Sequence, residues 1–321
     1  MNRCLSCLSP TLSHKLIHTT CYKKLFAAKT VSLDLSYTTS EIIRESALRA
    51  TRMSLGGSQP KVSVYADSGE LKLSYDLGDL ILKPSPPQHE YVSENEHFIM
   101  NLARVYGFSV PPFCLVRLAD RSYAFLIKRF DRVIKRKSIT KIHIEDMASV
   151  LSKPADSKYN GSYSEIGEAI KKHVRDSGLE LITLLDLVIF SYCLGNNDLH
   201  LKNISIIDKE SHYELSPIYD VLCSARYYSS APELALDLAP EYFGGLSLEG
   251  YYTAKDFLYL GTQLGLDKKV VLSRIKRIVS FQDRFIKMLQ ASFLNKEEQE
   301  RLKVIFIRQF EKFQNGLSLL I

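Results

Sequence analysis

Three polar residues in the second half of the chain have the types and spacing that phosphoryl transfer requires. Asp198 and Asn203 lie in GNNDLHLKN (residues 195–203), and Asp220 follows in SPIYDVL. Carboxylate and amide oxygens are hard ligands that suit Mg²⁺. In phosphotransfer enzymes of the protein-kinase type, a first aspartate receives the acceptor's proton, and an asparagine and a second aspartate hold metal. The alternative is that Asp198 and Asn203 only cap and turn the chain.

Phosphoryl transfer also needs cations and a backbone cradle for the phosphates, and suitable residues lie upstream. Gly56 and Gly57 form a glycine-containing loop, and Lys83 ends a strand-like run. Glu94 and Glu96 begin the next helical pattern, where one of them could pair with Lys83. Taken singly, these residues fit a plain turn, an exposed lysine and helix-start charges that the helix dipole favours. Their order along the chain favours the phosphotransfer interpretation.

The elements that would position these residues are strand-rich first and helix-rich afterwards. A polar turn joins ISII (204–207) to HYEL (212–215), and such a hairpin would bring Asp220 back beside Asn203. The segment 126–132 would form the hinge against an adenine base, with Asp131 reaching the ribose. Hydrophobic periodicity and turn residues predict helices over 40–53 and 94–106, strands over 62–65, 70–75, 79–84, 110–118 and 122–130, and helices over 143–152, 162–174, 179–193 and 253–319.

This pattern predicts an α+β protein with two lobes, a strand-rich N-lobe and a helical C-lobe. We expect a leader over 1–30, the N-lobe over 31–132 and the C-lobe over 133–321. The 321 residues are enough for a large core, and the net charge of +6 does not by itself indicate a nucleic-acid partner. No apolar run reaches about 18 residues, so no membrane helix is expected. The N-terminus lacks a signal-peptide core, which makes a cytoplasmic protein the default.

Five segments together resemble the HipA-like toxin kinases. They are SLGGSQPK, ENEHFIMNLARVYGFSVP, IKRFDR, GNNDLHLKN and LSPIYDVL, and the resemblance covers about residues 40–260. It implies a bilobal kinase-like fold, ATP with Mg²⁺, and phosphorylation of a protein serine or threonine. Family members act as toxins by inactivating an aminoacyl-tRNA synthetase.

The resemblance also implies a role for each matching residue. Asp198 would be the catalytic aspartate, with Asn203 and Asp220 as metal ligands. Lys83 would bind phosphate, with Glu96 as its partner. Ser54 and Ser58 would be autophosphorylated; without the resemblance, hydrogen bonds of both hydroxyls to the loop backbone would be preferred. The remaining ATP-site residues would be Gly56, Gly57, Ser58, Gln59 and Lys61 in the phosphate loop, Lys128, Arg129, Phe130 and Asp131 at the hinge, and His200, Lys202 and Tyr219 near the catalytic aspartate.

The chain has about 50 residues before the glycine loop, fewer than the longer family members. It therefore resembles the short form of the family, HipT, whose missing piece is a separate small protein, HipS. That form also implies a HipB-like DNA-binding partner, and no direct DNA binding by this chain. We expect the HipS-like protein to bind the N-lobe.

Two other enzyme or binding functions stay open on the residues alone. A small-molecule or lipid kinase would use the same motifs, because acceptor specificity lies outside them. A degenerate kinase could serve as a scaffold, although suitable residues fill the catalytic positions.

The leader carries a second constellation. Cys4, Cys7, His18 and Cys21 have the form C-x₂-C-x₁₀-H-x₂-C, and three thiolates with an imidazole can form a closed zinc site. The alternative is a reduced leader without metal. The six cysteines as a whole do not resemble a disulfide framework.

Overall fold

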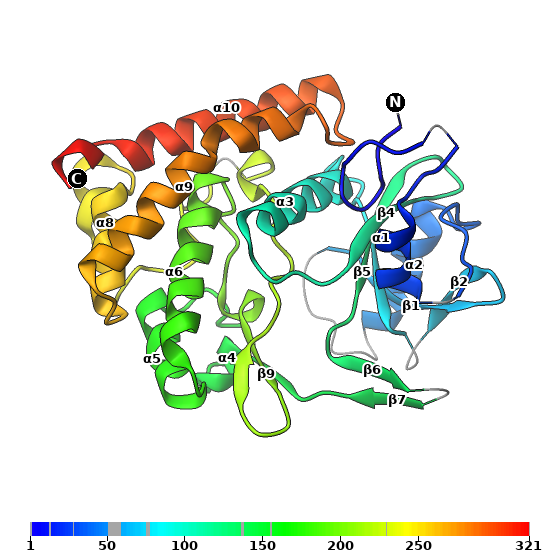
Figure 1. Cartoon of the computed structure of the whole chain (residues 1–321), viewed down its shortest axis with the longest axis horizontal. Coiled ribbons are helices and arrows are strands. Elements are labelled where there is room, and N and C mark those ends of the chain that lie inside the picture. Colours follow the sequence, from blue (N-terminus) through cyan, green and yellow to red (C-terminus); the bar gives the residue numbers. More distant parts are fainter. Residues whose placement is uncertain are drawn as a thin grey trace. The chain divides into compact units, whose positions relative to one another are not determined.

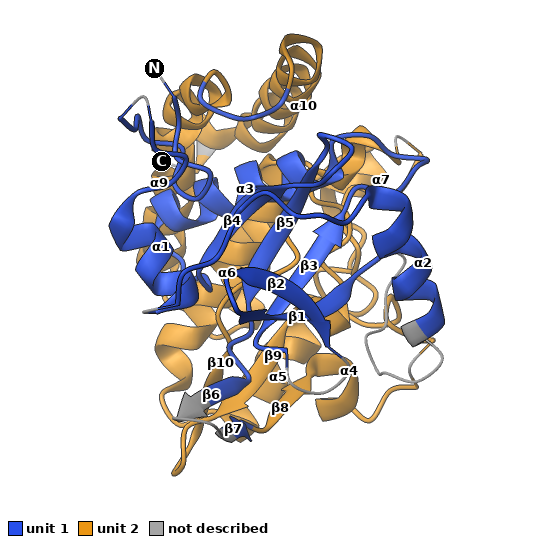
Figure 2. Ribbon diagram, turned by 90° about the vertical axis from the view of Figure 1, so that its right-hand side faces the viewer, with its two compact units in different colours: residues 1–142, 291–294 blue, residues 143–290, 295–321 orange. Residues whose placement is uncertain are grey.

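The computed structural model describes residues 2–12, 14–27, 29–50, 59–74, 78–135, 138–154, 156–228 and 230–320. The chain divides into two compact units (Figure 2). Unit 1 contains residues 1–142 with 291–294, and unit 2 contains residues 143–290 with 295–321. Residues 291–294, which belong to unit 1, come in sequence between two long C-terminal helices of unit 2.

Unit 1 is built on a five-stranded antiparallel sheet in the order β2-β1-β3-β5-β4 (Figure 1). β3 and β5 are neighbouring inner strands of the sheet. They pair antiparallel, and Lys83 lies opposite Phe125. A separate two-stranded ribbon follows the sheet in sequence. The strands are β1 (Val62–Asp67), β2 (Glu70–Ser74), β3 (Leu80–Pro84), β4 (Phe113–Arg117), β5 (Tyr123–Lys128), β6 (Arg132–Lys135) and β7 (Ser138–Lys141).

The helices of unit 1 are α1 (Thr19–Phe26), α2 (Thr39–Ala50) and α3 (Val92–Tyr106). α3 packs against β3, β4 and β5. Phe98, Ile99 and Leu102 are fully buried on it. The helix ends at Gly107, whose φ of 111° is the left-handed conformation that a glycine adopts without steric cost. The sequence predicts this helix over 94–106, and in the structure it begins two residues earlier, at Val92.

Unit 2 is mainly helical, with a small antiparallel sheet in the order β10-β9-β8. Its central helix α6 is apolar on nearly all sides, and Asp186 on it is paired with Arg274 of α9, 2.8 Å from Nε to Oδ1. The elements are β8 (Ile144–Asp146), α4 (Met147–Val150), α5 (Tyr163–His173), α6 (Ser177–Cys193), the 3₁₀ turn Leu201–Asn203, β9 (Ser205–Asp208), β10 (Tyr213–Leu215), the 3₁₀ turn Ser224–Arg226, α7 (Gly244–Glu249), α8 (Ala254–Gln263), α9 (Lys268–Leu289), α10 (Lys296–Gln314) and the 3₁₀ turn Leu317–Leu319.

The predicted α+β class is confirmed, but one helix prediction needs correction. The segment 143–152 is not one helix, because Ile144–Asp146 pairs with β9 and the Asp146 side chain caps α4 at its N-terminus. The run 253–319, predicted as helical, contains α8, α9, α10 and the 3₁₀ turn Leu317–Leu319. Gly265, with φ 77°, turns the chain after α8, and Asp267 then caps α9.

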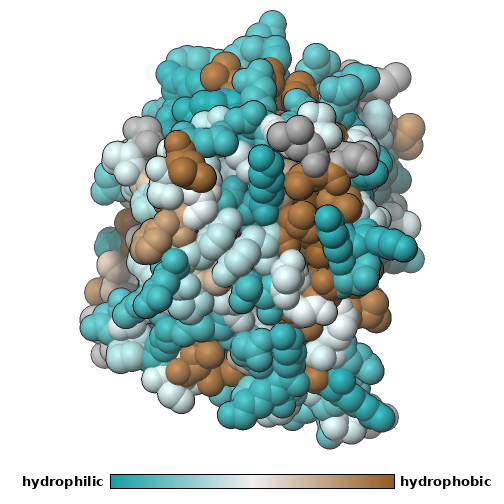
Figure 3. Space-filling model, turned by 90° about the vertical axis from the view of Figure 1, so that its left-hand side faces the viewer, coloured by the Kyte–Doolittle hydropathy of each residue, from teal (hydrophilic) through white to brown (hydrophobic). Residues whose placement is uncertain are grey.

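The face shown in Figure 3 is mostly hydrophilic, with several separate groups of hydrophobic residues. Large exposed apolar side chains include Leu12 and Leu48 in unit 1 and Phe243 and Leu248 in unit 2. Among the described helices, none combines the length and the apolar character that crossing a membrane requires.

Candidate functional site

The predicted catalytic loop follows α6, and its first turn depends on a glycine. Gly195 adopts φ 68°, and a Cβ atom there would lie 2.8 Å from Ile305 Cγ2 and 3.2 Å from Cys223 Sγ. Both the backbone conformation and the close packing therefore require glycine. The turn directs the chain away from α6 into the polar segment 196–203.

Asp198 is held by its neighbours while its carboxylate stays accessible. Tyr159 donates its hydroxyl hydrogen to Asp198 Oδ1 at 2.6 Å, and the side chain of Asp198 is 39% exposed. Burial and this hydrogen bond raise the pKa of Tyr159, so the phenol stays protonated and acts as the donor. The Asn203 amide nitrogen donates to the Asp198 carbonyl oxygen at 2.8 Å, so its amide oxygen is left to bind a cation.

His200 is buried in the same loop as a neutral imidazole. Burial lowers its pKa, and the Lys158 ammonium adds to this effect, while the Asp198 and Asp220 carboxylates oppose it. Lys158 Nζ donates to His200 Nε2 at 3.0 Å. The ring proton must then be on Nδ1, a buried atom that makes no hydrogen bond with the described residues. This arrangement leaves a buried donor, which an anionic oxygen of a ligand could satisfy.

Asp220 returns to this loop through the β9–β10 hairpin, as the sequence predicted. Tyr219 donates to the Lys202 carbonyl oxygen at 2.9 Å and lies 2.6 Å from Ser205 Oγ. Because Asp220 directly follows Tyr219, these contacts hold it beside the loop, and its charge opposes the lowering of the His200 pKa. Asp220 has φ 58°, a left-handed conformation that Asp tolerates better than most residues. Unit 2 therefore gathers Asp198, His200, Asn203 and Asp220.

In unit 1, the expected ion pair between the strand lysine and a helix glutamate is present. Lys83 Nζ lies 2.6 Å from Glu96 Oε1, and both side chains are buried. The ammonium also lies 5.9 Å from the centre of the Phe125 ring. The partner is Glu96 rather than Glu94. Burial instead raises the pKa of Glu94 to about 7.

The hinge residues predicted for adenine binding are engaged in contacts within unit 1. Lys128 Nζ donates to the Leu25 carbonyl oxygen at 2.8 Å. Arg129 donates to both carboxylate oxygens of Asp131, at 2.9 and 2.6 Å. Burial opposes ionisation of Asp131, but Arg129 outweighs it and lowers the pKa of this carboxyl. A hydrogen bond from Asp131 to a ribose would have to compete with this ion pair, and the ribose role of Asp131 stays a prediction.

Part of the predicted phosphate loop lies outside the described residues. This applies to Ser54, Gly56, Gly57 and Ser58. Gln59 and Lys61, at the end of the loop, are half-buried, and the Lys61 backbone amide donates to Ser46 Oγ at 2.9 Å.

The four predicted metal ligands of the leader come together. The three Sγ atoms and one ring nitrogen of Cys4, Cys7, His18 and Cys21 all lie within 4.8 Å of one another. All these cysteines are free thiols. The cluster could therefore hold one metal ion.

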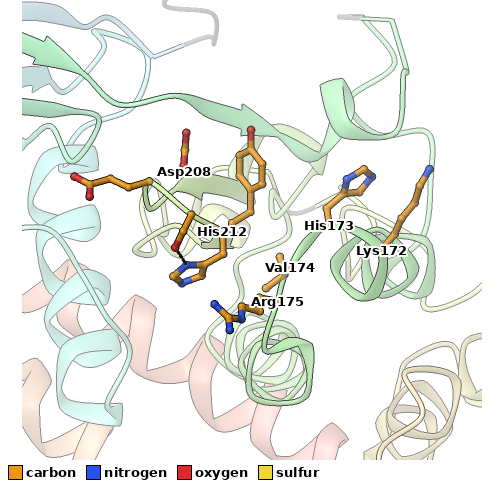
Figure 4. A pocket seen from close by; sticks show the side chains of 9 residues that line it. Lys172, His173, Val174, Arg175, Asp208 and His212 are labelled. Atoms are coloured by element: carbon orange, nitrogen blue, oxygen red, sulfur yellow. Dashed lines mark hydrogen bonds between the residues drawn. The ribbon is translucent and has the colours of Figure 1, made fainter.

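Unit 2 also has an open pocket of about 510 Å³ away from these residues (Figure 4). The last turn of α5 and the following residues line it together with the β9–β10 hairpin. Figure 4 shows the bond of 3.1 Å between Ser211 Oγ and His212 Nδ1. Lys172 and Arg175 oppose Asp208 in charge, so the lining has no single sign and defines no ligand class.

Sequence reasoning missed Lys158 and Tyr159. They come from a short segment that contains Pro154, Asp156 and Gly161, residues typical of an ordinary loop. Tyr163, the first residue of α5, also donates to the Leu199 carbonyl oxygen at 3.0 Å and supports the catalytic loop from the same side. No local pattern marks these contacts, since they join residues about 40 positions apart.

The family description "HipA-like C-terminal domain" matches residues 53–285 of the chain. The chain belongs to this family. Both gathered sets of side chains, around Lys83 in unit 1 and around Asp198 in unit 2, lie within the matched region.

Individual relatives agree with this HipA-like assignment. A Haemophilus influenzae protein, provisionally named a kinase, is 30% identical over 280 residues, which are 81% of this chain and 82% of the relative. The "Serine/threonine-protein kinase toxin HipA" of Shewanella oneidensis is 25% identical over 71% of this chain and 55% of its own length. The HipA-like chain thus spans about half the length of that toxin.

A solved structure supports the fold. The Shewanella oneidensis HipA chain, determined in complex with HipB and operator DNA, superposes with a TM-score of 0.69 at 20% identity. The match covers 84% of this chain and 67% of that chain. The HipA-like chain therefore has the bilobal, kinase-like α+β fold that the sequence predicted.

Proposed function

We propose that this HipA-like chain is an ATP- and Mg²⁺-dependent serine/threonine protein kinase that acts as the toxin of a toxin–antitoxin system. The observation that carries the proposal is the loop network of unit 2, where Tyr159 and Lys158 hold Asp198 and His200 in place beside Asn203 and Asp220. A loop that served only to turn the chain would not need an accessible carboxylate held by Tyr159 next to a buried histidine held by Lys158.

In the proposed reaction, the acceptor hydroxyl oxygen forms a bond to the γ-phosphorus of ATP as the bond to the β-phosphate oxygen breaks. Asp198 accepts the hydroxyl proton, and ADP leaves with the electron pair of the broken bond. Asp198 is suited to this role because its carboxylate is accessible and its other contacts fix its direction. Lys83, held by Glu96, would bind phosphate oxygens of ATP.

The side chains of the site fit the proposed Mg²⁺ and ATP. Asn203 and Asp220 offer an amide oxygen and a carboxylate, which are the oxygen ligands that Mg²⁺ prefers. The Mg²⁺ ion would neutralise charge on the phosphates when bound. His200 Nδ1 would donate its buried hydrogen to a phosphate oxygen, which its neutral state and its bond from Lys158 favour.

The finer residue roles extend the same proposal. Gly56, Gly57, Gln59 and Lys61 would contribute to the phosphate loop, and Ser54 and Ser58 would be autophosphorylated. For the leader cluster Cys4, Cys7, His18 and Cys21, the proposed metal is Zn²⁺, because a tetrahedral set of thiolates and imidazole suits it. The remaining proposed ATP contacts are Lys128, Arg129, Phe130, Asp131, Lys202 and Tyr219.

Partners and location are also proposals. The HipB partner of the Shewanella toxin supports a HipB-like DNA-binding antitoxin for this chain. An aminoacyl-tRNA synthetase is the proposed protein target, in the cytoplasm. A small HipS-like protein would bind unit 1, where Leu12 and Leu48 expose apolar surface.

Labelled ATP tests the reaction and separates the alternatives. The purified chain is incubated with [γ-³²P]ATP and Mg²⁺, alone and with a cell extract, and protein and non-protein fractions are counted. We expect label in the chain itself and in a protein of the extract, with a gain of about 80 Da per phosphate by intact mass. Label in a lipid or metabolite other than ATP and inorganic phosphate, with none in protein, would indicate a small-molecule or lipid kinase. Label that stays only in ATP and inorganic phosphate would indicate a scaffold.

A further inference from the structure

We infer that the Cys4, Cys7, His18 and Cys21 site, loaded with Zn²⁺, fastens the N-terminal segment onto α3 and thereby keeps Glu96 paired with Lys83. The activity part of this inference depends on the proposed kinase function. The metal and its effect on α3 do not, and they are tested separately below.

The ligand atoms already approach the spacing of a closed tetrahedral site. A zinc–sulfur distance of about 2.3 Å implies ligand separations of roughly 3.8 Å. The four ligand atoms lie within 4.8 Å of one another, and Cys7 Sγ lies 3.2 Å from His18 Nδ1. Shifts of less than about 1 Å would therefore complete the tetrahedron.

The groups around the ligands are arranged as in a metal site. The Pro10 carbonyl oxygen lies 3.0 Å from His18 Nε2, and because a carbonyl only accepts, Nε2 carries the ring hydrogen. The Nδ1 lone pair is then directed at the cluster, and a bond from the other ring nitrogen to a carbonyl is typical of metal-bound histidine. The backbone N–H of His18 also points at Cys4 Sγ, at 3.4 Å, as it would toward a thiolate.

The segment between the first two cysteines lies directly on α3 and on the neighbouring strand. Asn101 Nδ2 of α3 donates to the Ser6 carbonyl oxygen at 3.0 Å, and His97 Nε2 lies 3.2 Å from the same oxygen. The Leu115 amide of β4 donates to the Leu5 carbonyl oxygen at 2.8 Å. Asn101 and His97 are both buried, so these contacts are part of the packing of unit 1.

Charge links the cluster to the same helix. Burial lowers the pKa of the Arg104 guanidinium on α3, and negative charge on Cys21, Cys7 and Cys4 opposes this effect. A zinc ion with three thiolates and one neutral imidazole carries one net negative charge. The loaded site would thus compensate Arg104, which a cluster of neutral thiols would not do.

The helix held in this way carries the residue that pairs with the proposed phosphate-binding lysine. Glu96 directly precedes His97, and its carboxylate lies 2.6 Å from Lys83 Nζ. Cys21 lies in α1, whose end is fixed to β5 by the bond of 2.8 Å from Lys128 to the Leu25 carbonyl oxygen. The cluster therefore connects two anchored segments, and loss of its metal would release the contacts of Ser6 with α3.

The test uses the full chain and begins with the metal. Zinc content is measured by inductively coupled plasma mass spectrometry, and Co²⁺ is substituted to read the visible absorption of a tetrahedral thiolate site. We expect one zinc per chain in the wild type and less than about one fifth of that in Cys21→Ser and His18→Ala. His14→Ala is the matched control, because His14 is an exposed histidine of the same segment. A wild-type chain that neither contains nor takes up Zn²⁺ overturns the inference.

Coupling to α3 is tested in the wild-type chain, which avoids variants that fail to fold. Zinc is removed with a zinc-selective chelator and then restored, while hydrogen exchange of residues 92–106 and phosphoryl transfer are followed. We expect faster exchange in α3 and at least a tenfold slower transfer without zinc, both reversed by Zn²⁺. Unchanged exchange, or unchanged transfer by an active enzyme, overturns the coupling. If the chain shows no transfer in any state, zinc content and exchange still decide the structural part.

Discussion

Tyr159 and Lys158 determine the state of the two ionisable side chains in the catalytic loop. The Tyr159 hydroxyl fixes the direction of Asp198, and Lys158 fixes the tautomer of His200. The carboxylate is left accessible and the Nδ1 hydrogen is left as a donor. At the scale of single residues, the proposed site therefore rests on support from outside the motif 195–203.

Glu94 gives a pH-dependent prediction. Burial raises its pKa from 4.5 to about 7, so the folded chain binds a proton more tightly than the unfolded chain does. Its contribution to stability is complete below about pH 4.5 and is lost as the pH rises through 7. Glu94→Gln should therefore stabilise the protein relative to wild type by about 1–3 kcal/mol more at pH 8 than at pH 4.5.

Urea unfolding at both pH values measures this difference. The control is Glu70→Gln, because Glu70 is an exposed glutamate of the same unit. The difference in unfolding free energy between this variant and the wild type should be the same at both pH values. A Glu94→Gln effect that is equal at pH 4.5 and pH 8 would show that this carboxyl ionises normally in the folded chain.

Two variants separate the structural role of the buried Lys83–Glu96 ion pair from its proposed catalytic role. Lys83→Met leaves the Glu96 charge buried without its partner and should cost about 3–5 kcal/mol of stability. Adding Glu96→Gln removes that charge and should recover most of the loss. Phosphoryl transfer should be lost in both variants, because neither has the proposed phosphate-binding cation. Near wild-type transfer by the stable double variant would assign the pair a purely structural role.

At the scale of elements, the turn after α6 controls where the catalytic loop begins. Gly195→Ala would force alanine into a left-handed conformation and bring its Cβ to 2.8 Å from Ile305 Cγ2. Gly250→Ala is the matched control, because Gly250 has φ 75° but no atom within 4 Å of the added Cβ. Gly195→Ala should destabilise the chain by about 1–3 kcal/mol more than Gly250→Ala, measured by chemical unfolding. Equal costs would mean that the loop moves freely to accommodate the Cβ.

The elements show what the sequence could and could not predict. The five strands of the unit 1 sheet and helix α3 were predicted because alternation and helical spacing are clear locally, whereas the ribbon β6–β7 was not predicted. β8 was missed, since three half-buried residues have no periodicity and become a strand only by pairing with β9. The site residues that lie in sequence motifs were predicted. Lys158 and Tyr159 were not, because their contacts with the loop form only when the fold brings separate segments together.

At the scale of the whole molecule, the two units carry different parts of the proposed chemistry. Unit 1 holds the lysine–glutamate pair and the leader cluster, and unit 2 holds the proposed oxygen ligands and the proposed catalytic aspartate. Both units contain residues of the region that matches the HipA-like family, 53–285. A kinase function predicts that neither unit alone transfers phosphate.

The most direct test of the kinase proposal compares Asp198→Asn, Asp220→Asn and the control Asp176→Asn in phosphoryl transfer from [γ-³²P]ATP. Asparagine keeps an acceptor for the Tyr159 hydroxyl at position 198 and tolerates the left-handed backbone at position 220, so both variants should fold. Asp176 is exposed in the same unit and lies outside the loop network. We predict that the first two variants lose about three orders of magnitude or more in rate, with thermal unfolding close to wild type, while Asp176→Asn retains full activity. Transfer at the wild-type rate by a folded Asp198→Asn or Asp220→Asn protein would contradict the assignment of this loop as the catalytic centre.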